Sequence, residues 1–136
     1  MRFNDIIGQA SAKESLAGMV KANRLSHALL FLAKDGTGGL PLALAMSQYL
    51  VCEKVNGSND AGPSLFGESE PVAMPEDACG QCPACLKASA MVHPDIHYSY
   101  PVIPRKSGDK PVSTDYIKEW REFAQLHPYG DVYDWL

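Results

Sequence analysis

The pattern of apolar and polar positions predicts helices that alternate with short strands. Apolar residues recur at helical spacing in 11–23 and in 113–126. Segment 40–52 is apolar nearly all round, which is typical of a helix covered by its neighbours. The apolar run at 27–32 and the alternating pattern at 96–103 predict strands.

Capping residues and short sequence patterns indicate where these elements begin and end. Ser11 opens a capping-box pattern with Glu14, and Ser113 is the predicted cap of the last long helix. A short helix is predicted at 86–91. Residues 131–136 have the pattern of a further amphipathic helix that is just beginning, so we expect the domain to be incomplete at its C-terminal end.

The segment 27–49 predicts a strand, a glycine-rich loop and a helix, the unit in which P-loop proteins hold nucleotide phosphates. Set against the pattern G-x-x-x-x-G-K-[ST], this loop keeps only the inner glycine, Gly38. Ala33 replaces the first glycine, Gly39 the lysine and Leu40 the hydroxyl residue. The sequence therefore predicts an α/β P-loop unit whose phosphate-binding groups are missing.

Each replacement removes a defined part of phosphate chemistry. Gly39 has no amine for the β- and γ-phosphates, and Leu40 cannot ligate Mg²⁺. Pro41, in the first turn of the helix, has no N–H to offer to an anion. Lys34 is the alternative cation, although it lies early in the loop beside Asp35. We therefore expect no ATP hydrolysis at this site. The degenerate nucleotide-binding loop comprises Ala33, Gly36, Gly38, Gly39, Leu40 and Pro41.

The cysteines form a second candidate site. Cys79, Cys82 and Cys85 have the C-x-x-C-x-x-C spacing that lets three thiolates converge on one cation. Cys52, at the end of the preceding helix, is the expected fourth ligand. Four sulfurs that leave no coordination position open predict a closed, structural Zn²⁺ site. The alternatives are a [4Fe–4S] cluster and metal-free or redox-active thiols.

The histidines are predicted to be structural. His93 lies in a turn and His97 in a predicted strand, and four cysteines already complete a metal site without them. His27, at the edge of the first predicted strand, has no obvious catalytic partner in the sequence.

Composition narrows the functional classes. The chain has 136 residues and a formal net charge of −4, which argues against tight binding of DNA or anionic membranes by bulk electrostatics. We find no secretory leader pattern and no apolar run approaching the roughly 20 residues of a membrane span. A cytoplasmic location is expected, where clustered cysteines are thiols or metal ligands more often than disulfides. The polar, Pro- and Gly-rich stretch at 53–78 is predicted to be a flexible loop.

Three sequence features together resemble the AAA+ family of bacterial DNA polymerase III clamp loaders. Phe3 to Gln9 resembles the F-x-D-I-[IV]-G-Q box at the start of these domains, and Arg24 to Phe31 resembles their R-x-x-H-A-x-L-F strand. The cysteine set followed by His-Pro-Asp at 93–95 is similar to their zinc module. The resemblance covers residues 1–103.

The resemblance implies a three-layer α/β AAA+ domain, of which residues 1–136 would be the N-terminal part. Residues 52–92 would be a zinc-binding insertion that contains the loop at 53–78. In this family the zinc module occurs in ATP-hydrolysing gamma/tau subunits and in delta-prime subunits, many of which bind no ATP. The degenerate loop favours the delta-prime type.

The implied function is that of a non-catalytic member of the polymerase holoenzyme. Such a subunit works with gamma/tau and delta subunits in a hetero-pentamer that loads a sliding clamp onto primed DNA. An ATP-hydrolysing gamma/tau-type subunit with an unusual loop is one alternative. A stand-alone zinc-binding interaction module is the other.

Overall fold

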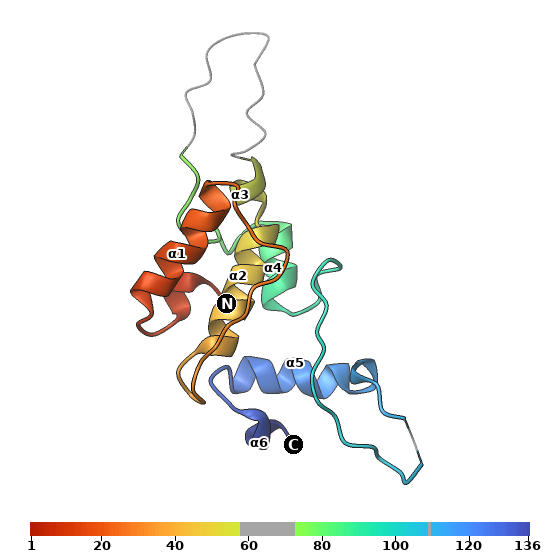
Figure 1. Cartoon of the computed structure of the whole chain (residues 1–136). Coiled ribbons are helices and arrows are strands. Elements are labelled where there is room, and N and C mark those ends of the chain that lie inside the picture. Colours follow the sequence, from red (N-terminus) through yellow and green to blue (C-terminus); the bar gives the residue numbers. More distant parts are fainter. Residues whose placement is uncertain (58–72, 109) are drawn as a thin grey trace.

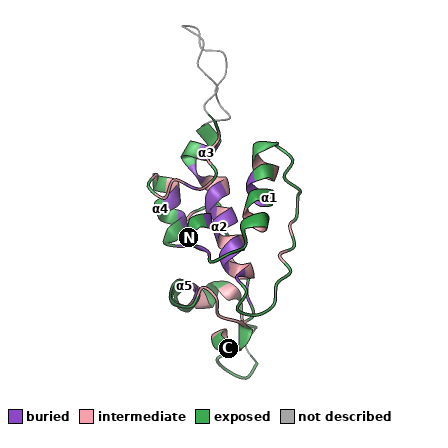
Figure 2. Ribbon diagram, turned by 90° about the vertical axis from the view of Figure 1, so that its left-hand side faces the viewer, coloured by how far each residue is buried: buried purple, intermediate pink, exposed green. Residues whose placement is uncertain are grey.

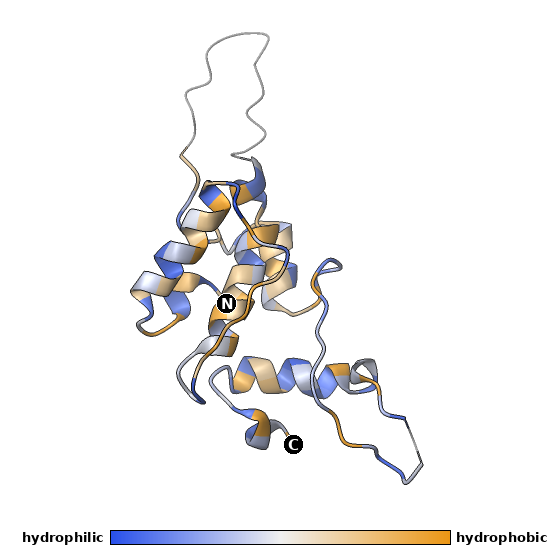
Figure 3. Cartoon of the chain, in the orientation of Figure 1, coloured by the Kyte–Doolittle hydropathy of each residue, from blue (hydrophilic) through white to orange (hydrophobic). Residues whose placement is uncertain are grey.

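A single central helix organises the fold (Figure 1). The computed structural model describes residues 1–57, 73–108 and 110–136. Its central helix, α2, spans Gly39–Val51 and packs against α1, Ala10–Lys21, on one side and α4, Pro83–Ser89, on the other. Buried residues concentrate on α2 (Figure 2), and Ala45 and Tyr49 have no exposed surface. The predicted all-round apolar helix is therefore the core of the molecule, mostly on the hydrophobic side of the scale in Figure 3.

The remaining helices of the described residues are short or lie at the C-terminal side. Helix α5 carries Trp120 and Ala124 into a second apolar cluster with Tyr100 and Met91. The Tyr100 and Trp120 rings stack with their centroids 4.3 Å apart. The elements are the 3-10 helices η1, Phe3–Asp5, and η2, Ser113–Tyr116, and the helices α3, Glu53–Gly57, α5, Ile117–Leu126, and α6, Val132–Trp135.

The predicted strands are not confirmed, because the part of the chain that the structure describes contains no strand. Segment 27–32 nevertheless has strand-like alternation. Leu29 and Phe31 pack against the core, whereas Leu30 and Leu32 are 89% and 92% exposed. A strand requires hydrogen bonds to a neighbouring strand, and none of the described segments supplies them. Segment 96–103 is irregular for the same reason.

The starts of three helices differ from the predicted ones. Helix α1 begins at Ala10 after Gln9, so the predicted capping box at Ser11 is wrong. The hydroxyl of Ser113 donates to the carbonyl of Tyr100 at 3.0 Å, and Ser113 is not the cap of α5. Helix α4 starts at Pro83, before the predicted 86–91, because Cys82 caps it by accepting from the Cys85 N–H.

The predicted flexible loop at 53–78 is wrong for its first residues, which form α3. Its middle part, 58–72, lies outside the described residues. The predicted helix at 131–136 is present as α6, with Asp131 as its N-cap. None of the helices that the structure describes combines the length and hydropathy of a membrane span.

Candidate functional site

The degenerate loop forms a closed turn between the extended segment 27–32 and α2. The Thr37 N–H and hydroxyl donate to the Lys34 carbonyl at 3.1 Å and 2.6 Å. Gly36 and Gly38 have φ angles of +73° and +94°, a region in which only glycine is free of strain. The inner glycine of the pattern is therefore needed for the shape of the turn itself.

Ala33 and Gly39 face each other at the two ends of the loop. A Cβ added to Gly39 would lie 2.7 Å from the Ala33 Cβ, a separation that side chains do not tolerate. The methyl group of Ala33 thus occupies the place where a side chain at position 39 would begin. The two replacements predicted from the sequence are therefore sterically linked.

The side chain of Tyr129 lies against the loop from the turn after α5. A Cβ added to Gly38 would meet the Tyr129 ring at 3.2 Å. The Tyr129 hydroxyl accepts a hydrogen bond of 3.0 Å from the Ile7 N–H. One side chain therefore joins the loop to the segment that precedes α1.

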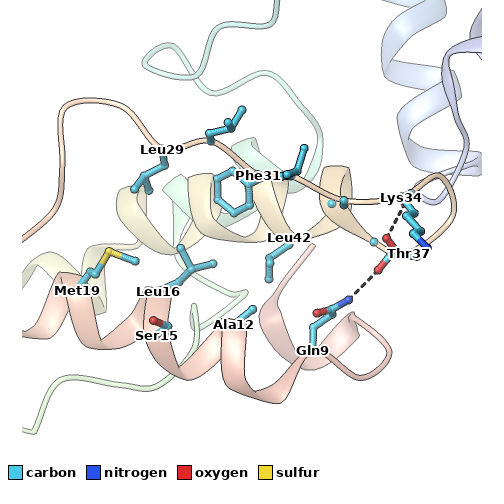
Figure 4. Close-up of a pocket in the computed structure, with 15 residues that line it drawn as sticks. Gln9, Ala12, Ser15, Leu16, Met19, Leu29, Phe31, Lys34, Thr37 and Leu42 are labelled. Atoms are coloured by element: carbon cyan, nitrogen blue, oxygen red, sulfur yellow. Dashed lines mark hydrogen bonds between the residues drawn. The ribbon is translucent and has the colours of Figure 1, made fainter.

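Gln9 holds the other flank of the loop. Its side-chain amide donates to the Thr37 carbonyl at 3.0 Å (Figure 4). Its backbone is left-handed, with a φ of +57°, which bends the chain into α1. The box at 3–9 and the loop are thus joined by side-chain contacts from both Gln9 and Tyr129.

Two clefts border the loop, and neither provides strong anion chemistry. The larger one, of about 610 Å³, runs between α1 and segment 29–34 and is lined mainly by apolar side chains such as Leu16, Met19 and Phe31 (Figure 4). Lys34 is the only cation among the described residues that line it. The smaller cleft, beside Tyr129, measures about 180 Å³, below the roughly 300 Å³ at which ligand pockets begin.

The structure brings the four cysteine sulfurs of Cys52, Cys79, Cys82 and Cys85 together at the other end of α2. All four atoms lie within 4.8 Å of one another, and the Cys79 and Cys85 sulfurs are 3.9 Å apart. Zinc–sulfur bonds of about 2.3 Å place the sulfurs of a tetrahedral site roughly 3.8 Å apart. The arrangement is therefore compatible with zinc.

Backbone amides point at the sulfurs, as they do around metal-bound thiolates. The N–H groups of Cys79, Cys82 and Cys85 donate to the sulfurs of Cys52, Cys79 and Cys82, each at 3.4 Å.

These surroundings affect the thiols unequally. The Gln81 backbone amide, which donates to the sulfur, lowers the pKa of Cys79 to about 6. Burial raises the pKa of Cys85 to about 12. A divalent cation would favour the ionised form of all four thiols, so the donor set fits Zn²⁺.

The cysteine cluster is tied to the N-terminal segment by Asp77. Its carboxylate accepts from the N–H groups of Phe3 and Asn4, both at 2.9 Å, and from its neighbour Ala78 at 2.7 Å. The Arg2 side chain lies over Gly80, whose φ is +71°. The cluster therefore holds the segment that leads into α1.

The histidines lie apart from this cluster. His27 and His97 are exposed, and His93 accepts a 3.2 Å hydrogen bond from the Asp95 N–H within its own turn. Among the described residues, the group that could hold a metal ion consists of the four cysteines.

Comparison with known proteins decides the family. The sequence pattern of the family described as DNA polymerase III, delta subunit, matches residues 8–133. The chain belongs to this DNA polymerase III delta-subunit family.

Two curated proteins that are similar to this chain are named DNA polymerase III subunit delta′. The Escherichia coli K12 protein is 30% identical over 114 residues, which cover 84% of this chain and 28% of that protein. The Bacillus subtilis 168 protein is 31% identical over 93 residues, covering 68% of this chain and 22% of that protein. The alignments thus span less than a third of either relative. No solved structure matches.

Sequence reasoning missed the contacts of three residues that shape the two candidate sites, namely Gln9, Asp77 and Tyr129. Gln9 and Asp77 contact residues 28 and 74 positions away, and Tyr129 contacts a residue 122 positions away. The Pro-Tyr-Gly sequence at 128–130 is typical of a turn but does not indicate which residue Tyr129 contacts. Contacts between residues so far apart along the chain leave no local pattern in the sequence.

Proposed function

We propose that this chain is the N-terminal part of a delta-prime-type, non-catalytic subunit of the DNA polymerase III clamp loader. Family membership supports the replication role. The steric conflict between Ala33 and a side chain at position 39 is the observation that carries the non-catalytic assignment. A lysine at position 39 would need the space that the Ala33 methyl group fills.

The proposed fold is an AAA+ domain of the α/β three-layer type. Segments 27–32 and 96–103 would be strands of its sheet once neighbouring strands are present. The alternating burial of Leu29 to Leu32 supports this for the first segment, since strands bury alternate side chains. Residues 52–92 would be the zinc-binding insertion.

In this proposal the four cysteines hold a structural Zn²⁺ ion that fixes α4 and the end of α2. Bound zinc would neutralise the clustered thiolates and crosslink Cys52 to the 79–85 segment. Asp77 and Arg2 then position the N-terminal segment on that module. The cysteine cluster thus serves the shape of the subunit and performs no chemical step.

The subunit would act as a relatively rigid member of a hetero-pentamer with gamma/tau and delta subunits. ATP turnover would belong to the gamma/tau subunits, and the sliding clamp and primed DNA would be bound through the assembly. The closed turn at 34–37 supports this role, because its Thr37 N–H is already hydrogen-bonded within the loop.

The test is a calorimetric titration of the full-length protein with Mg·ATP, combined with an ATPase assay. We expect neither binding nor hydrolysis, together with co-purification with gamma/tau and delta subunits. Lys34→Ala, with Lys118→Ala on the exposed face of α5 as its control, tests the alternative cation. ATP hydrolysis by the parent would overturn the proposal in favour of a gamma/tau-type ATPase, and its loss only in Lys34→Ala would identify Lys34 as the cation of that site.

A further inference from the structure

The turn after α5 is shaped so that Tyr129 reaches the loop. Helix α5 ends at Leu126, and the Gly130 N–H donates to the His127 carbonyl at 2.9 Å. A Cβ on Gly130 would lie 2.8 Å from the Phe123 ring and 3.0 Å from the His127 oxygen. A side chain at position 130 would therefore force this turn open.

Both the ring and the hydroxyl group of Tyr129 make contacts with other parts of the chain. Its ring covers Gly38, the one glycine of the phosphate pattern that remains, and its hydroxyl accepts from the Ile7 N–H. Pro128, Tyr129 and Gly130 also form the wall of the small cleft at the loop. A phosphate approaching Gly38 from this side would have to displace the ring.

We propose that Tyr129 is an internal plug that closes the degenerate loop and locks it to the segment before α1. The proposal deepens the proposed function, since it rests on the loop being without nucleotide. In a nucleotide-binding protein the phosphates hold such a loop in place. Here a side chain of the same chain takes over that role, with the ring filling space and the hydroxyl satisfying a backbone donor.

Hydrogen exchange of the full-length protein, read by NMR or by mass spectrometry with residue resolution, tests the plug. Tyr129→Ala should speed exchange of the Ile7 amide by about fivefold or more, roughly the factor for one lost hydrogen bond. It should also speed exchange of the Thr37 amide, which is hydrogen-bonded within the loop that the ring covers. Tyr129→Phe keeps the ring and should speed exchange at Ile7 alone. Tyr133, which is 83% exposed on α6, provides the matched control Tyr133→Ala, for which no change is expected.

Unchanged exchange at Ile7 in both Tyr129 variants would overturn the plug. Because Tyr129→Phe removes a single hydroxyl, it tests the hydrogen bond even if the alanine variant fails to fold. The amides of α2 report on folding in every sample. ATP hydrolysis by the parent would overturn the proposed function, whereas unaltered exchange in an ATP-inert parent would overturn the plug alone.

Discussion

The two ends of helix α2 carry two candidate sites that depend on different parts of the chain. At its N-terminal end the loop stands where the sequence pattern of a P-loop would lie, but it lacks the lysine, the hydroxyl and one amide of that pattern. Beyond its C-terminal end Cys52 joins three other cysteines whose sulfurs all lie within 4.8 Å of one another. One end presents a turn shaped by its backbone without phosphate-binding side chains, whereas the other presents four side chains that can converge on one cation.

The difference shows which property each site requires. A metal cluster depends on four side chains, so each cysteine is individually necessary. A loop that joins two elements depends on backbone conformation, so Gly38, whose φ is +94°, is required for the turn and a lysine is not. The glycine is then held by Tyr129 and the loop by Gln9.

Loss of the metal should have the largest effect. Structural zinc contributes on the order of 10 kcal/mol in small modules, comparable to the total stability of a domain. Cys85→Ser should therefore abolish stoichiometric zinc in the full-length protein, measured by plasma mass spectrometry, and lower its thermal midpoint sharply. His93→Ala is the control and should keep the metal. Equal zinc in parent and Cys85→Ser would contradict the four-thiolate site.

Introducing a lysine at position 39 alone should be the next most damaging change. Gly39→Lys places a Cβ against Ala33 and should cost about 1–3 kcal/mol in urea unfolding, as overpacking does. The double variant Ala33→Gly/Gly39→Lys should recover most of this loss. If the double variant is no more stable than Gly39→Lys, the steric link between the two positions is wrong.

Removing Asp77 should weaken the contact between the cysteine cluster and the N-terminal segment. Asp77→Ala leaves the N–H groups of Phe3 and Asn4 without their acceptor and should cost about 1–3 kcal/mol. Glu76→Ala removes an exposed carboxylate 3.7 Å from Lys21 and should cost less than about 1 kcal/mol. Urea unfolding compares the two, and equal losses would argue against the Asp77 link.

The smallest effect should come from Gln9. Gln9→Ala removes one exposed hydrogen bond to the Thr37 carbonyl and should cost about 0.5 kcal/mol. The exposed Gln125 on α5 offers the control Gln125→Ala. A loss above about 2 kcal/mol would mean that Gln9, and not the backbone turn, is what maintains the loop.

The candidate ligand residues could be predicted from the sequence, whereas the contacts between segments far apart in the chain could not. The cysteine spacing predicted the sulfur cluster, because C-P-x-C is also a helix start with Cys82 as its cap. The missing lysine could be read directly at position 39. The apolar pattern of a single segment was not enough to predict a strand, since a strand forms only when two segments pair by hydrogen bonds.

Polar side chains with several possible partners gave the wrong predictions. Ser11 and Ser113 both have capping patterns, yet the first lies inside α1 and the second bonds Tyr100. No local sequence pattern predicted the roles of Asp77 and Tyr129. Each accepts a hydrogen bond from a backbone N–H that lies far away along the chain. The distance in sequence, more than the chemistry, limits such predictions.

The contact between Ala33 and position 39 also sets how many changes a cation at this loop would need. A substitution at position 39 alone brings a side chain against the Ala33 methyl group, and one at position 33 alone supplies no cation. A library of variants that changes one position at a time therefore does not reach an unstrained loop with a lysine at position 39. A library that changes positions 33 and 39 together does.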